Sequence, residues 1–87
     1  MNIKISNLRF GKYANKNTAI TAENFSITSN ILLKLKSDDL VAIRDSKYLI
    51  DELISSKIIK EEYLQEIIEG EDKILIYQLT DKCINHK

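Results

Sequence analysis

The first half of the chain alternates apolar and polar residues at a spacing of two, which predicts β-strands. A first strand is predicted over residues 2–10, where the apolar parity changes and indicates a slip or bulge near Asn7. Two further strands are predicted over residues 18–28 and 30–36, because apolar and polar side chains also alternate there.

Two turn-rich stretches interrupt this pattern. The sequence GKYANKN over residues 11–17 is the richest cluster of turn residues and predicts an exposed loop. The sequence KSDD over residues 36–39 leaves two alternatives open. It is either a hairpin turn leading into a strand through residues 40–43 or the start of a helix capped by Ser37. The hairpin is favoured because polar residues at positions 44–47 interrupt a helical stripe.

From Asp45 onward the apolar spacing becomes that of amphipathic helices. A first helix, capped by Asp45 or Ser46, has one apolar side formed by Leu49, Ile50, Leu53 and Ile54. A second helix has an apolar stripe formed by Ile59, Tyr63, Leu64, Ile67 and Ile68. Gly70 suits the left-handed position that ends a helix. Together they predict a helical hairpin broken around residues 55–58.

The chain then continues with KILIYQL over residues 73–79, which is apolar on both faces of a strand. A strand of this kind belongs inside a sheet, so we expect it to return to a central position, with the first strand as a candidate neighbour. Residues 80–87 are predicted to form a short tail. The fold class is therefore α+β in one domain, residues 1–87. An antiparallel sheet of four or five strands carries the helical hairpin on one face, and the final strand returns to that sheet.

The predicted helical hairpin contains a family-like pattern. The sequence YLIDELISSKIIKEEYLQEII over residues 48–68 combines a Leu-rich helix, a small residue, an Ile-Ile step and a Glu-Glu-aromatic helix start. In these features it resembles the short C-terminal (SHOCT) domain, although Ser56 or Lys57 stands where that pattern has a turn glycine. The resemblance covers about a quarter of the chain and implies at most an interaction module.

Size and composition narrow the class of protein. The chain has 87 residues, 44% of them hydrophobic, which suits one small globular domain. Lys and Arg total 13, as do Asp and Glu, but residues 1–36 hold six cations against one carboxylate and so carry +5. Residues 37–87 therefore carry −5. A single Cys excludes an internal disulfide, and no apolar run suits a signal peptide or a membrane span, so we expect a cytoplasmic protein.

Enzymatic motifs are not found in the sequence. The two glycines, Gly11 and Gly70, lie too far apart for a phosphate-binding loop. The one histidine, His86, stands next to the end of the chain, where a nucleophile and its base are poorly held together. Cys83 and His86 have ligand-like spacing, but a closed zinc site needs two more such ligands. We therefore predict no catalysis, no cofactor and no metal.

Acidic residues are concentrated in the predicted second helix. Six carboxylates fall within residues 61–72, and Glu62, Glu66 and Glu69 recur at helical spacing. The simpler interpretation is a solvated helix face. The functional alternative is a rigid row of carboxylates that docks on a basic groove of a protein partner.

A basic loop is the second candidate contact. Arg9, Lys12, Tyr13 and Lys16 combine cations with an aromatic ring, a mixture that suits phosphate contact and base stacking. The alternative is a solvated loop in which Tyr13 covers an edge of the core. The sequence pI of about 6.6 lies below the basic range of dedicated nucleic-acid binders, so we expect weak or no binding of free nucleic acid.

These observations favour a small non-enzymatic binding protein that contacts a host protein or nucleoprotein rather than a membrane. One example is a phage or mobile-element inhibitor of a host machine, such as a CRISPR-type defence nuclease. The alternative is a nucleic-acid-binding or regulatory module that uses the basic N-terminal half. An enzyme whose site needs a partner subunit ranks third.

Overall fold

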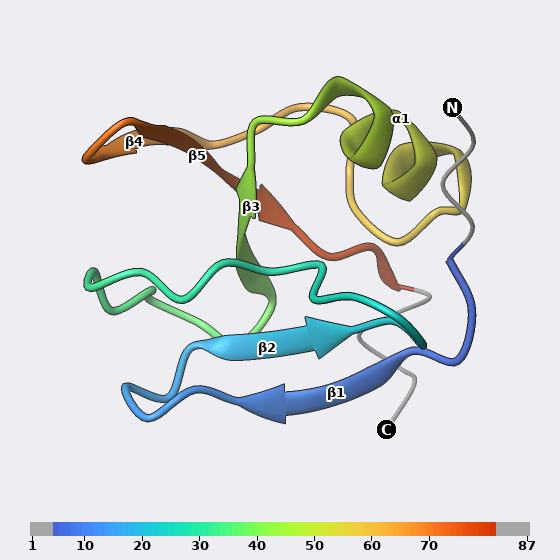
Figure 1. The fold of residues 1–87 in the computed structure, drawn as a ribbon, viewed down its shortest axis with the longest axis horizontal. Coiled ribbons are helices and arrows are strands. Elements are labelled where there is room, and N and C mark those ends of the chain that lie inside the picture. The colour runs from blue at the N-terminus through green and yellow to red at the C-terminus, as the bar shows by residue number, and fades with distance from the viewer. Residues whose placement is uncertain (1–4, 82–87) are drawn as a thin grey trace.

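In the described part of the chain, five strands form two antiparallel sheets, and one helix accompanies them (Figure 1). The computed structural model describes residues 5–81. A two-stranded ribbon is formed by β1 (Arg9–Lys12) and β2 (Thr18–Thr21). A three-stranded sheet of order β3-β5-β4 is formed by β3 (Leu40–Arg44), β4 (Gln65–Glu69) and β5 (Asp72–Gln78). The single helix of the described residues is α1 (Lys47–Ser55). The predicted α+β class is confirmed, whereas the prediction of one sheet carrying a helical hairpin is wrong.

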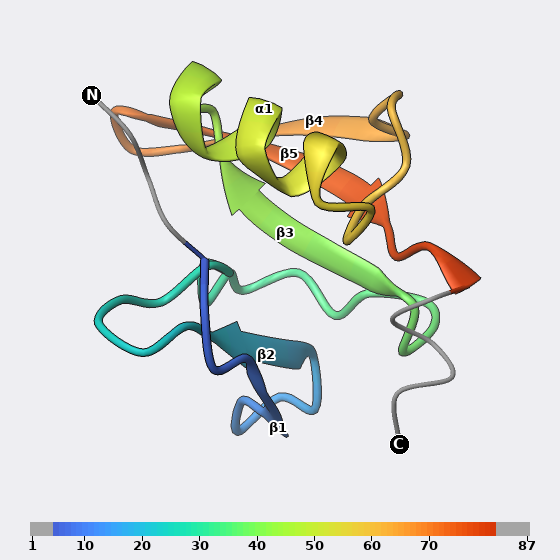
Figure 2. The same ribbon diagram turned by 90° about the vertical axis from the view of Figure 1, so that its right-hand side faces the viewer.

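The three-stranded sheet has α1 over one face (Figure 2), where Ile20, Ala22 and Ile27 join the same cluster, and residues 31–35 over the other. Toward α1 it contributes Val41, Ile43, Leu75 and Tyr77, which pack with Ile50 and Leu53 of the helix. On the opposite face a smaller cluster joins Ala42, Ile74 and Ile76 to Ile31 and Leu35. Both faces are therefore buried, which explains why β5 is apolar at successive positions.

The central place of β5 confirms the sequence prediction, although its neighbours are β3 and β4 rather than the first strand. Of the preferred interpretation of KSDD, the strand is confirmed, since β3 follows directly. The hairpin is not, because residues 30–36 form no strand that pairs with β3. Asp39 fixes the start of β3 against the end of β5. Its carboxylate accepts a hydrogen bond from Gln78 Nε2 at 2.7 Å, and its carbonyl accepts one from the Leu79 N–H at 2.7 Å.

The prediction of a second helix before Gly70 is wrong. Residues 65–69 form β4, which pairs antiparallel with β5 across a two-residue loop at positions 70–71. Gly70 has the predicted positive φ, 61°, but it uses this conformation at the first loop position of a hairpin rather than at a helix end. A helix here would leave one edge of β5 without hydrogen-bond partners, and β4 supplies them.

The predicted strand over residues 30–36 is also wrong, and of residues 18–28 only β2 is a strand. Side-chain amides take the place of a neighbouring strand. Asn17 Nδ2 donates to the Leu33 carbonyl at 2.8 Å, and Asn15 Nδ2 donates to the Ile31 carbonyl at 2.8 Å. Because these amides satisfy the backbone locally, the segment runs irregularly along the sheet.

The N-terminal strand begins later than predicted. β1 starts at Arg9, and Asn7, where an irregularity was predicted, has a φ of 55°. Residues 2–4 of the predicted strand lie outside the described residues. At the other end of β1, Gly11 and Lys12 belong to the strand rather than to the loop.

The first predicted helix is confirmed as α1, preceded by Ser46, whose side chain makes no capping hydrogen bond. The helix ends in a Schellman motif. The Ile58 N–H donates to the Leu53 carbonyl at 2.9 Å, and the Lys57 N–H donates to the Ile54 carbonyl at 3.0 Å. Lys57 takes the left-handed conformation with a φ of 62°, where glycine is the usual residue. Within residues 5–81 no helix has the length and apolarity to cross a membrane.

Candidate functional site

The three candidate acidic residues do not form a helical row, and that prediction is corrected here. Glu62 is exposed on the connection between α1 and β4, whereas Glu66 and Glu69 belong to β4. Side chains of a strand alternate between its faces, so two residues three positions apart point to opposite faces of the sheet. The carboxylates therefore surround the β4–β5 hairpin instead of lining one side of it.

Glu66 lies on the α1 side of the sheet in a charged cluster with Lys73. The Lys73 ammonium is 3.3 Å from the Glu66 carboxylate and 3.7 Å from that of Asp45. The pKa of Lys73 lies above its ordinary value, first because it donates a hydrogen bond to Glu66 and next because of the charge of Glu66. All three side chains are more than 40% exposed, so water screens the pairs and they contribute little to stability.

Glu69 lies on the opposite face, where two carboxylates meet at the end of the hairpin. Its Oε2 accepts a hydrogen bond from the Leu32 N–H at 3.0 Å, which ties the irregular segment to β4. Asp72 stands directly opposite Glu69 in the β4–β5 register. The Asp72 carboxylate is 4.0 Å from Arg44 Nη2, so its charge is partly balanced.

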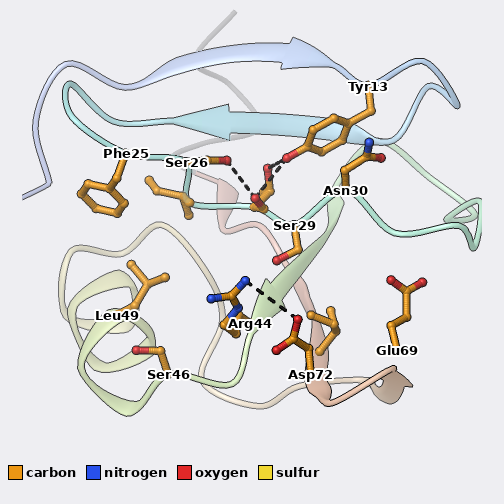
Figure 3. Close-up of a pocket in the computed structure, with 13 residues that line it drawn as sticks. Tyr13, Phe25, Ser26, Ser29, Asn30, Arg44, Ser46, Leu49, Glu69 and Asp72 are labelled. Atoms are coloured by element: carbon orange, nitrogen blue, oxygen red, sulfur yellow. Dashed lines mark hydrogen bonds and ion pairs between the residues drawn. The ribbon is translucent and has the colours of Figure 1, made fainter.

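A cleft of about 750 Å³ opens beside these carboxylates (Figure 3). Residues 25–30 and Tyr13 line one side, and Arg44, Glu69 and Asp72 line the other. Phe25 and Leu49 make its far end apolar (Figure 3). Two lining hydroxyl groups are engaged with the backbone: Ser26 Oγ donates to the Thr28 carbonyl at 2.9 Å, and Thr28 Oγ1 accepts from the Ile20 N–H at 3.0 Å. This arrangement suits the binding of a polar or cationic group.

The structure does not gather the four residues of the basic loop. Arg9 and Lys12 are three positions apart on β1 and therefore point to opposite faces of the ribbon. Lys12 Nζ lies 2.7 Å from the Asp38 carboxylate and also donates to Thr18 Oγ1 at 3.2 Å. Lys16 is exposed in the turn, with a φ of 71°. The positive charges are therefore dispersed.

Tyr13 turns away from these cations toward the cleft (Figure 3). Its hydroxyl lies 3.0 Å from the Thr28 carbonyl, to which it donates, and 2.9 Å from Thr28 Oγ1. It thus lines the same cleft as Glu69, a residue of the acidic set. No sequence pattern places these two residues at one site, because the cleft is built by segments far apart in the chain.

Exposed apolar side chains accompany the carboxylates of residues 61–72, and the sequence prediction missed this exposure. Tyr63, Leu64 and Ile68 are 49%, 62% and 63% exposed, although the helical interpretation assigned them to a buried stripe. The Tyr63 ring makes an edge contact with that of Tyr77, with centroids 6.2 Å apart. A turn-forming Gly-Glu pair at positions 70–71 between two apolar runs was the available signal for a hairpin.

Neither the metal-ligating residue types nor comparisons with known proteins assign a function to this chain. Within the described part of the chain, no three His, Cys, Asp or Glu side chains are grouped as a metal site would require. Cys83 and His86 lie outside the described residues. No protein-family model matches the chain, and neither a curated protein nor a solved structure matches it. The resemblance to the SHOCT domain also fails on the fold, because β4 stands where its second helix would be.

Proposed function

We propose that this chain is a non-enzymatic binding protein that docks on a basic surface of a protein partner through its acidic hairpin, residues 61–72. The observation that carries the proposal is the exposure of Tyr63, Leu64 and Ile68 among six carboxylates. Exposed apolar side chains rimmed by charges are the usual composition of a protein interaction surface.

Apolar and charged groups have separate roles in such a contact. Burial of the three apolar side chains supplies affinity, since apolar area removed from water is the main favourable contribution. The carboxylates attract a basic partner, increase the association rate and fix its orientation. Glu66, Glu69 and Asp72 sit on hydrogen-bonded strands, so little conformational freedom of their backbone is lost on binding.

For the biological setting we propose an inhibitor of a host machine that handles nucleic acid, carried by a phage or mobile element and acting in the cytoplasm. Support comes from the small size of the chain and from its charge layout. A groove that binds a nucleic-acid backbone is lined with Lys and Arg, and an acidic hairpin complements it. A nuclease of a CRISPR-type defence system belongs to this class of partner.

The test is capture of a partner from nuclease-treated host lysate by the immobilised protein. We compare the wild type with the double variant Glu62→Lys and Glu66→Lys, and identify captured proteins by mass spectrometry. The expected result is a basic protein that the wild type retains and the double variant loses. Its association rate with the wild type should fall as salt is added, because salt screens the attraction.

A matched control changes the same number of charges elsewhere. Glu23→Lys with Asp81→Lys reverses two exposed carboxylates outside residues 61–72, so the net charge changes equally. This control should still capture the partner, and both double variants should melt near the wild type. Equal capture by all three proteins, or equal loss in both double variants, would contradict the proposal.

A further inference from the structure

The outer edge of β4 is open. β5 is the only strand beside β4 within residues 5–81, and the backbone hydrogen bonds of the described residues include none to that edge. Because a two-residue loop joins β4 to β5, hydrogen-bonded pairs with β5 occur at Glu69 and at every second residue before it. The backbone N–H and C=O groups of Glu66 and Ile68 therefore point outward, where a further strand would find them.

The side chains along this edge define what that strand must carry. Residues directly opposite each other in neighbouring strands share a face and contact one another. Basic residues opposite Glu66 and Glu69 would form favourable cross-strand pairs, and so would apolar residues opposite Ile67 and Ile68. Read from Glu69 to Glu66, the complementary sequence is basic, apolar, apolar, basic, the same in either strand direction.

A second copy of this chain does not fit the edge. Pairing of β4 with β4 of another molecule would bring together two copies of residues 61–72, each with six carboxylates and no cation. Like charges placed opposite one another in neighbouring strands are destabilising. The carboxylates thus oppose self-association of the exposed edge while favouring a basic strand.

We infer that the partner contributes an extended segment with the pattern basic-apolar-apolar-basic, which adds to β4 as a fourth strand of the sheet. This inference rests on the proposed function and specifies how the partner is held. Main-chain hydrogen bonds to Glu66 and Ile68 provide the attachment, and the flanking carboxylates select the charge.

The probe is a synthetic capped peptide, acetyl-Thr-Lys-Val-Val-Lys-Thr-amide, added to the full-length protein. Amide hydrogen exchange is followed by NMR at Glu66 and Ile68, whose outward N–H groups exchange freely without the peptide. At about nine-tenths occupancy, exchange at both positions should slow about tenfold, because only the free tenth remains open. The protein variant Ile68→Pro removes an outward donor and should weaken binding, while Ile68→Val should not.

Two control peptides separate strand addition from charge attraction. One replaces both lysines with glutamate, and the other carries N-methyl groups on both valines, which keeps the charges but blocks backbone pairing. We expect neither control to slow exchange at Glu66 or Ile68. Equal binding of the N-methylated peptide, or binding without slowed exchange at these positions, would overturn strand addition and leave the proposed function intact.

The remaining outcomes are equally decisive. If the lysine peptide does not bind while the acidic hairpin still captures a basic partner, strand addition is wrong. If the peptide does not bind and the charge reversals leave capture unchanged, the proposed function fails as well. Sedimentation velocity could instead show a dimer whose Glu66 and Ile68 amides are protected from exchange without the peptide. That result would mean that a second copy of the chain, rather than a partner strand, pairs with β4.

Discussion

The side-chain oxygen of Asn17 accepts a hydrogen bond from the backbone N–H of Leu35 at 2.8 Å, across a sequence distance of 18 residues. The amide nitrogen of the same side chain donates to the Leu33 carbonyl. One buried side-chain amide therefore satisfies backbone groups of the irregular segment, as a paired strand does in a sheet. It holds Leu35 in the smaller apolar cluster, against the face of the sheet away from α1.

We expect Asn17→Ala to destabilise the protein by about 2–3 kcal/mol, because Asn17 is buried and two backbone groups lose their partners. Urea denaturation at neutral pH measures the change. Asn24→Ala provides the control, since Asn24 is exposed and its replacement should change the free energy of unfolding by less than about 0.5 kcal/mol. Similar stability of the two variants would show that the side chain of Asn17 does not organise the segment.

Asp39 should make the stability depend on acid pH. The pKa of Asp39 lies below its ordinary value because the side chains of Ser37 and Gln78 donate hydrogen bonds to its carboxylate. A lowered folded-state pKa means that the stabilisation is complete above the unfolded-state value, about 3.9, and is lost as the pH falls through the folded-state value. We expect Asp39→Asn to cost about 1 kcal/mol at pH 7 and almost nothing at pH 2, since the carboxylate is largely solvated. Urea midpoints at both pH values check this, and an equal loss at both would contradict it.

Lys57 offers a stabilising substitution. Its left-handed conformation at the end of α1 is unfavourable for a residue with a Cβ atom, whereas glycine adopts it readily. Lys57→Gly should therefore raise the free energy of unfolding by about 0.5–1 kcal/mol and raise Tm. Lys60→Gly is the matched control, because Lys60 has no positive φ and should gain nothing. A lower Tm for Lys57→Gly would contradict this prediction and would indicate that packing of the aliphatic part of the Lys57 side chain stabilises the fold.

Free nucleic acid should bind weakly, because the cations of the N-terminal half are dispersed and Lys12 is paired with Asp38. Fluorescence anisotropy with labelled single-stranded and double-stranded DNA and RNA at about 50 and 200 mM salt measures this. Any binding that depends on phosphate contacts must fall steeply between these concentrations. Tight, salt-sensitive binding that is lost in the double variant Lys12→Gln and Lys16→Gln would instead favour a nucleic-acid-binding module.

The elements that the sequence predicted correctly are those whose local spacing of apolar residues favoured one type of secondary structure. β5 is apolar at successive positions, and only a central strand buries both faces. α1 has an apolar stripe at helical spacing that begins after Asp45 and Ser46, residue types that favour a helix start. The strand β3 was the favoured one of two alternatives after KSDD, because polar residues interrupt the helical spacing there.

The sequence named the candidate residues of the acidic group and of the basic loop. It did not show which of them lie side by side, because that depends on how distant segments of the chain meet. Tyr13 and Glu69 line one cleft although they are 56 positions apart in the chain. Arg9 and Lys12, three positions apart, point away from each other because they lie on a strand.

The sequence by itself determined the α+β class, the central strand β5, the helix α1 and an acidic segment before β5. Only the tertiary structure decided the conformation of residues 59–69, whose apolar positions fit a helical stripe and whose residue types favour helix as well. β5 had one edge left to pair, and Gly70 could make a tight turn two residues before it. Hydrogen bonding along that buried strand outweighed a weak local helix preference. Buried backbone N–H and C=O groups without partners destabilise the fold by more free energy than the helix propensity of these residues contributes.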